Sequence, residues 1–162
     1  MIAAPGFTSL VARWAHYYGD TKVVSAGVTY VHLAGILLGG GTAVAADRES
    51  LRLRPDGGAE MSWGLARLRS VHRLVVMGLA IIVTSGLMIL FSDLDTYLGS
   101  ALYWTKMALV AALLLNGFVR LRAEGVLERG GDAWKTFRVT SVLSLVLWFG
   151  ILLAGAYLTT IA

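Results

Sequence analysis

The sequence predicts an all-α fold, a bundle of four transmembrane helices preceded by an interfacial amphipathic helix. Of the 162 residues, 57% are hydrophobic and only 15% are charged, and the mean hydropathy is +0.71. Soluble domains contain about 25% charged residues. The apolar residues are also collected into four long blocks that polar connections separate. At this length, residues 1–162 are expected to form a single membrane domain.

Residues 7–18 predict a helix that lies along the membrane surface. Apolar side chains recur at helical spacing on one face, among them Phe7, Trp14 and Tyr18, and polar side chains occupy the opposite face. A helix of this kind lies in the interface plane, with its aromatic rings at headgroup depth. The segment lacks the basic start and the cleavage site of a secretory signal peptide, so we do not expect its removal.

The four apolar blocks predict membrane-spanning helices. Each block is close to the roughly 20 residues needed to cross a hydrocarbon core about 30 Å thick. Spanning strands need only about ten residues and alternate apolar with polar positions, a pattern absent here. A helical pattern already resumes at Ser62, so the second helix is expected to begin outside the membrane. The predicted spans are residues 22–46, 72–91, 101–119 and 139–161.

The basic residues predict the orientation of the bundle. Eleven of the fourteen Lys and Arg residues lie in the first and third connections: Arg48, Arg52, Arg54, Arg67, Arg69, Arg73, Arg120, Arg122, Arg129, Lys135 and Arg138. By the positive-inside rule these connections face the cytoplasm and both termini face outward. The net charge of +4 then reflects membrane topology, and nucleic acid is not an expected partner.

Few residues in the predicted spans offer chemistry. The spans contain no Asp or Glu, and their main polar residues are His32, Thr84, Ser85 and Asn116. The absence of cysteine excludes disulfides, thiolate metal sites and cysteine nucleophiles. No phosphate-binding glycine loop, zinc-protease motif or Ser–His–Asp constellation is apparent. The sequence therefore favours a non-enzymatic protein, with a redox role only if haem is bound.

His32, near the middle of the first span, is the most informative residue. Neutral imidazole is a common transition-metal ligand and the usual axial ligand of b-type haem. Helix bundles build such sites from side chains on facing helices. The alternative is a structural histidine that is hydrogen-bonded to Asn116, to a hydroxyl or to a backbone carbonyl of a neighbouring helix. Both interpretations stay open.

His72 is the natural second ligand for a metal or a haem iron. If the membrane begins at Leu74, His32 and His72 differ in depth by roughly 15 Å, which is too far to share one iron. If the second helix enters the membrane earlier, the two histidines come closer to level. Arg69 and Arg73 would then be buried and would need anionic partners such as haem propionates. Binding of haem b or copper, and binding of no cofactor at all, are equally consistent with the sequence.

Small residues recur on the first span at four-residue spacing. They are Gly27, Gly35, Gly39 and Ala43. Such a stripe predicts a close approach between helices. Three scattered methionines could offer thioethers to Cu(I), although in apolar spans they are more typical of packing.

Three segments resemble a known family. The first span contains His32-Leu-Ala-Gly and a glycine run to Gly41, and the second follows Arg-Ser-Val-His-Arg with Thr84-Ser-Gly86. The third contains Gly99-Ser-Ala-Leu-Tyr-Trp-Thr-Lys106 and Asn116-Gly-Phe-Val-Arg120. Over residues 30–120 this pattern is similar to the small bacterial four-helix membrane proteins grouped around the copper-resistance D domain. The resemblance implies a bacterial inner-membrane bundle, with periplasmic termini, inward-facing His32 and His72, and a role with copper or haem.

Two functions from different classes follow. The first is a membrane protein that binds haem b or copper through His32, with His72 as second ligand, for electron transfer or metal handling. The second is a non-catalytic accessory subunit of a larger membrane complex, and its motivation is the shortage of polar chemistry. Its helices would contact partner subunits, lipids or pigments. An absorption spectrum with metal analysis distinguishes the two.

Overall fold

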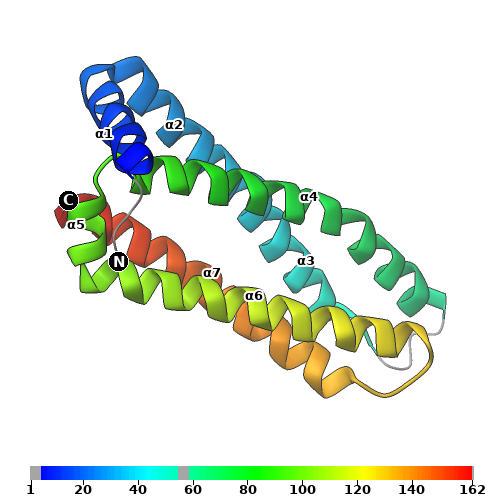
Figure 1. Cartoon of the computed structure of the whole chain (residues 1–162). Helices are drawn as coiled ribbons and strands as arrows, with labels where there is room; N and C mark the ends of the chain where they lie inside the picture. Colours follow the sequence, from blue (N-terminus) through cyan, green and yellow to red (C-terminus); the bar gives the residue numbers. More distant parts are fainter. Residues whose placement is uncertain (1–4, 55–58, 162) are drawn as a thin grey trace.

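The computed structural model describes residues 5–54 and 59–161, and all regular structure in these ranges is helical (Figure 1). This confirms the predicted fold class. The elements are α1 (Pro5–Asp20), α2 (Lys22–Gly35), the π-helical segment η1 (Ile36–Gly40), α3 (Gly41–Arg52), α4 (Ala59–Leu90), α5 (Leu94–Gly99), α6 (Ala101–Glu128) and α7 (Trp134–Ile161). Elements α2, η1 and α3 follow one another without a break.

Four of the helices are long and apolar enough to cross a membrane, as the sequence predicts. They cover Lys22–Arg52, Met61–Leu90, Ala101–Glu128 and Trp134–Thr160. The protein is therefore a multi-pass integral membrane protein. Helix α6 alone has 28 residues and a length of about 42 Å, whereas the hydrocarbon core is about 30 Å thick. The outermost turns of these helices thus extend beyond the hydrocarbon core.

The helices continue through residues that the sequence analysis assigned to connections. The third connection shrinks to residues 129–133, because α6 runs on to Glu128 and α7 begins at Trp134. Arg120 and Arg122 therefore belong to α6 rather than to a loop. The reason is physical: Arg, Lys and Glu are good helix formers, so charge ends an apolar span without ending the helix.

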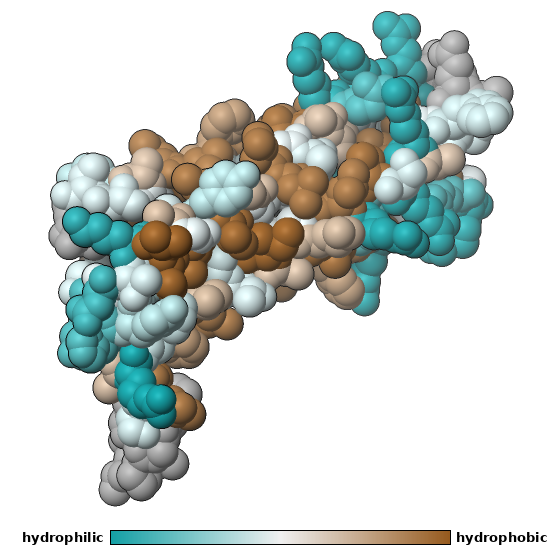
Figure 2. Space-filling model, turned by 90° about the horizontal axis from the view of Figure 1, so that it is seen from above, coloured by the Kyte–Doolittle hydropathy of each residue, from teal (hydrophilic) through white to brown (hydrophobic). Residues whose placement is uncertain are grey.

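The bundle has two distinct ends. Helices α1 and α5 lie at one end together with the last turn of α7, and we call this the α1–α5 end (Figure 1). The opposite end holds the connection between α6 and α7, and the helix segments and connections near it contain the eleven basic residues of the first and third predicted connections. Figure 2 shows a hydrophobic belt between hydrophilic ends. Such a belt is the surface expected of a membrane-spanning bundle.

Helix α1 is docked on the end of α4 by Trp14. The indole N–H of Trp14 donates a hydrogen bond of 2.8 Å to the carbonyl oxygen of Met88. The last carbonyls of a helix lack intrahelical donors, and those of Leu87, Ile89 and Leu90 are bonded by the backbone that follows. Trp14 therefore satisfies the remaining free carbonyl of this turn.

The short helix α5 was not predicted. Its N-cap is Asp93, whose carboxylate accepts a hydrogen bond of 3.2 Å from the backbone N–H of Thr96. Burial, with the neighbouring Tyr18 and Asp93, raises the pKa of the Tyr97 phenol above its usual value. The phenol therefore stays neutral where α5 approaches α1.

The first transmembrane helix packs on α4 through glycine. A Cβ added to Gly78 would lie 2.3 Å from the Cα and N atoms of Gly39, so the two backbones are in contact. A Cβ added to Gly35 would lie 2.8 Å from the side chain of Ile81. Gly35 and Gly39 thus confirm the predicted close approach. Gly27 does not take part, because nothing lies within 4 Å of its Cβ position.

Candidate functional site

His32 lies on α2 and faces α4, where it contacts Ser85. The Nδ1 atom of His32 is 2.9 Å from the Ser85 hydroxyl oxygen, across 53 positions of sequence. The ring also lies beside Gly86, whose added Cβ would be 3.4 Å from His32 Cε1. The side chain is half-buried. Ser85 therefore fixes the imidazole orientation, while the small Gly86 leaves it room.

The hydrogen-bond network assigns the tautomer of His32. The Ser85 hydroxyl donates to the carbonyl of Ile81 at 2.6 Å, and a hydroxyl has only one hydrogen. Ser85 must then accept a hydrogen bond from His32, so Nδ1 carries the proton. In the neutral ring, Nε2 keeps its lone pair. A histidine that ligates a metal through one nitrogen commonly donates its other N–H in this way.

The structure does not bring His32 and His72 together. His72 is exposed on α4. It lies thirteen residues before Ser85, which is the residue that His32 contacts. At 1.5 Å per residue this separates the two histidines by about 20 Å along the helix. The two cannot be axial ligands of one iron in this arrangement. The sequence left open that His32 and His72 lie at the same depth in the bundle, and the structure does not show that arrangement.

Arg69 and Arg73 are also distant from His32. Both are exposed near the beginning of α4. The Nη1 atom of Arg69 lies 3.8 Å from the Glu128 carboxylate at the end of α6. These arginines belong to the opposite end of the bundle, so they do not surround His32 as partners for propionates.

Within residues 5–54 and 59–161, no three His, Cys, Asp or Glu side chains gather closely enough to hold a metal ion. His32 therefore offers one nitrogen donor. Copper(I) sites use several soft or imidazole ligands, and a lone imidazole is a poor match. Haem b brings four nitrogen ligands of its own and needs only axial ligation from the protein. His32 could therefore supply one axial ligand to a haem, whereas it would leave most positions of a copper ion unfilled.

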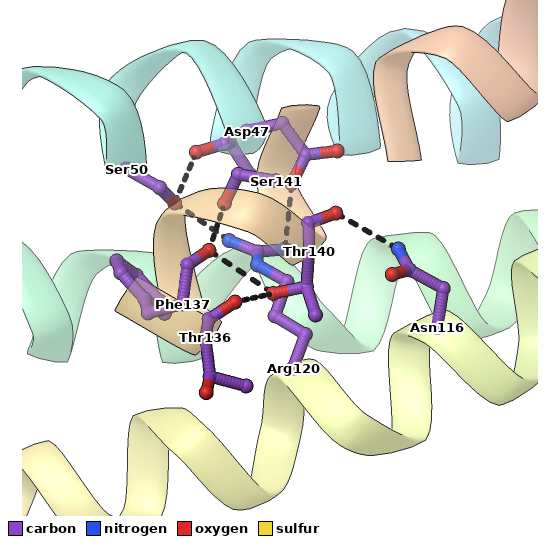
Figure 3. Close-up of polar contacts among 9 residues, drawn as sticks. Asp47, Ser50, Asn116, Arg120, Thr136, Phe137, Thr140 and Ser141 are labelled. Atoms are coloured by element: carbon purple, nitrogen blue, oxygen red, sulfur yellow. Dashed lines mark hydrogen bonds and ion pairs between the residues drawn. The ribbon is translucent and has the colours of Figure 1, made fainter. Parts of the chain in front are cut away.

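A second cluster, centred on Asp47, lies in the opposite half of the bundle (Figure 3). Asp47 on α3 is fully buried, and its Oδ1 is 3.1 Å from Arg120 Nη1 on α6. Arg120 Nη2 donates to the Ser50 hydroxyl at 2.6 Å, and its guanidinium carbon lies 5.6 Å from the centre of the Phe137 ring on α7. We call Asp47, Ser50, Arg120 and Phe137 the Asp47–Arg120 cluster.

The Asp47–Arg120 cluster links three helices through charge. Both carboxylate oxygens of Asp47 and Nε of Arg120 are buried, and the Ser144 hydroxyl on α7 is a hydrogen-bonding neighbour of the Asp47 carboxylate. Beside the cluster, Asn116 Nδ2 donates to the Thr140 carbonyl at 2.8 Å and thereby connects α6 to α7. Figure 3 shows these side chains converging from α3, α6 and α7. The arrangement holds the helices together and places a salt bridge inside the bundle.

Four acidic residues lie on the long apolar helices, past the ends of the predicted spans. Asp47 and Glu49 lie on Lys22–Arg52, and Glu124 and Glu128 lie on Ala101–Glu128. The predicted spans stopped one residue before Asp47 and five before Glu124. A signal was nevertheless present, because Asp47 follows Gly40 and Ala43 at helical spacing and so continues the small, buried face of the first helix.

The two clusters differ in what they can do chemically. His32 presents a nitrogen lone pair that an electrophilic metal centre can accept. In the Asp47–Arg120 cluster both charges are already paired, which favours a structural role. Comparisons of this chain with protein-family models, with curated proteins and with solved structures found no match. The function is therefore inferred from the chemistry and placement of these side chains.

Proposed function

We propose that this protein binds haem b in the membrane, with Nε2 of His32 as an axial ligand, and serves in electron transfer. The observation that carries the proposal is the hydrogen bond from His32 Nδ1 to Ser85, because it leaves Nε2 as the electron-pair donor. The resemblance to the copper-resistance D-like family, which implies copper or haem, points the same way. When bound, haem would supply the one-electron chemistry, and Ser85 would orient the ring and raise its basicity.

The test is the absorption spectrum of the purified protein after expression with a haem supply. We expect a Soret band in the wild type that His32→Ala abolishes. His72→Ala is the matched control and should keep the band, since His72 lies about 20 Å away along α4. Ser85→Ala should weaken haem affinity by about 10–100-fold, as loss of a ligand's orienting partner does.

Metal analysis of the same preparations gives the outcomes that overturn the proposal. Stoichiometric copper without a Soret band, lost in His32→Ala, would replace haem by copper at the same residue. A colourless and metal-free preparation would overturn both. Stoichiometric co-purification with another membrane protein would then favour the accessory-subunit hypothesis.

We further infer that the chain lies in a bacterial inner membrane with its α1–α5 end toward the periplasm. The support is the concentration of basic residues at the opposite end. The chain contains no native cysteine, so single cysteines can report the orientation. In intact cells, Asp95→Cys on α5 should react with a membrane-impermeant maleimide, whereas Asp132→Cys, between α6 and α7, should react only after lysis. The reverse labelling pattern would invert the topology.

A further inference from the structure

A cavity of about 310 Å³ lies between α4 and α6, in the half of the bundle that contains the Asp47–Arg120 cluster. Its wall extends from Leu68 to Leu79 on α4 and from Leu113 to Glu124 on α6. Eleven residues of helix correspond to about 16 Å, so the cavity is elongated along the bundle axis. Most of its wall is apolar. The cavity could therefore receive an alkyl chain that lies parallel to the helices.

The cavity is accessible from the lipid-facing surface. Four of its apolar wall residues are substantially exposed, with relative accessibilities of 45–55%: Val76, Leu114, Phe118 and Leu121. A molecule dissolved in the bilayer could therefore enter sideways between α4 and α6. Gly117 also lines the cavity, and nothing lies within 4 Å of its Cβ position. Free space thus continues to the backbone of α6.

One end of the cavity contains a carboxylate without a partner. Glu124 is only 8% exposed and makes no hydrogen bond or ion pair with the residues that the structure describes. Arg120 and Arg69 attract it at longer range, but Arg120 is paired with Asp47 and Arg69 with Glu128. The cavity wall therefore contains one buried carboxyl group that no cation contacts directly. A buried carboxylate without a partner is energetically costly.

We propose that this cavity binds a lipophilic cation, with its ammonium group at Glu124 and its apolar chain directed toward Leu79 and Leu113. The ammonium would supply the missing counter-charge, and the apolar wall would bury the chain. An anionic amphiphile is the poorer match, because Asp47 already neutralises Arg120 and Ser50 accepts its Nη2 hydrogen bond. The cation is either the headgroup of an aminolipid or a free alkylamine, since both present the same chemistry.

The test is equilibrium binding of radiolabelled decyltrimethylammonium to the protein in phosphatidylcholine nanodiscs. We expect saturable binding of one probe per chain, and we expect Glu124→Gln, which keeps the shape and removes the charge, to lower the affinity at least tenfold. Glu49→Gln is the matched control and should bind as the wild type does, because Glu49 pairs with Arg52 and does not line the cavity. Decyl sulfate, of equal chain length and opposite charge, should not compete.

A second pair of variants tests the location without touching a charge. Gly117→Leu should fill the cavity and abolish binding, whereas Gly27→Leu, on the distant groove between α2 and α4, should not affect it. Both glycines have open space at Cβ, so neither substitution meets a backbone clash at that atom, and circular dichroism checks that both variants fold. Competition by phosphatidylethanolamine in the nanodisc would identify an aminolipid, and its absence a free amine. Non-saturable binding, or equal binding in Glu124→Gln and the wild type, would overturn the proposal.

Discussion

Arg120→Ala is expected to lower the free energy of unfolding by about 3–5 kcal/mol, the cost of breaking a buried ion pair from one side. The substitution leaves the fully buried Asp47 carboxylate without its counter-ion and Ser50 without its donor. For a chain of this size each kcal/mol corresponds to about 2–4 °C, so the melting temperature in mild detergent should fall by on the order of 10 °C. Thermal unfolding followed by circular dichroism measures the effect.

The control for this prediction is Arg122→Ala, two residues further along the same helix. Arg122 is exposed, and its guanidinium carbon lies 4.3 Å from the centre of the Phe118 ring. Its loss should therefore lower the free energy of unfolding by no more than about 1 kcal/mol. Replacing both Asp47 and Arg120 by leucine should recover most of the stability, because it removes the buried charges together. A double variant as unstable as Arg120→Ala would contradict the assignment of the loss to an unpaired carboxylate.

Gly78→Ala is expected to lower the free energy of unfolding by about 3 kcal/mol, although it adds only one methyl group. This is the upper end of the usual range for overpacking. The new Cβ would lie 2.3 Å from backbone atoms of Gly39, which cannot rotate away as a side chain does. Segment η1 and helix α4 must therefore separate, and the adjoining α2 moves with η1. Loss of the His32–Ser85 hydrogen bond should accompany the instability, and it would appear as a weaker Soret band if haem is bound there.

Gly27→Ala provides the matched comparison for Gly78→Ala. Both glycines lie on helices that contribute to the same helix pair, but the Cβ position of Gly27 is open. Alanine there should be neutral or should stabilise the protein by up to about 1 kcal/mol, since glycine is the weaker helix former. Equal destabilisation by the two substitutions would show that the cost comes from helix propensity or insertion and not from the Gly39 contact.

The fold class and the number of spans could be predicted from the sequence because hydrophobic blocks in a bilayer leave few alternatives. The backbone of each block must satisfy its own hydrogen bonds, which makes a helix the only solution for a 20-residue apolar run. The amphipathic pattern around Trp14 likewise sufficed to predict α1. Its hydrogen bond to Met88 could not be predicted, since it depends on how the end of α4 approaches α1.

The positions of polar residues inside the bundle were harder to predict. Hydropathy shows where a helix becomes too polar for lipid, so the predicted spans ended just before Asp47 and Arg120. In the structure these two charges neutralise each other inside the bundle. An ion pair 73 positions apart in sequence leaves no local pattern. Glu124 was missed for the same reason, because its burial depends on α4 lying beside α6.

The candidate site was predicted in part. His32 was identified from its place in an apolar run, and Ser85 was noted only as one of several polar residues. Their pairing required knowledge of which faces of α2 and α4 meet. The depth of His72 depended on where α4 begins, and the structure places that beginning at Ala59, far before the apolar run. Hydrophobic periodicity alone shows neither where α4 begins nor how deep His72 lies.

The π-helical segment η1 joins the two halves of the first transmembrane helix. Each residue of an α-helix turns the chain by about 100°, and the wide π-turn takes up one residue more than an α-turn without rotating the residues that follow. Deleting a single residue from Ile36–Gly40 would therefore restore a regular α-helix and keep Asp47 facing Arg120, whereas inserting one into the regular helix at residues 41–46 would turn Asp47 away by about 100°. The length of this helix is thus adjustable at η1 but not between η1 and Asp47.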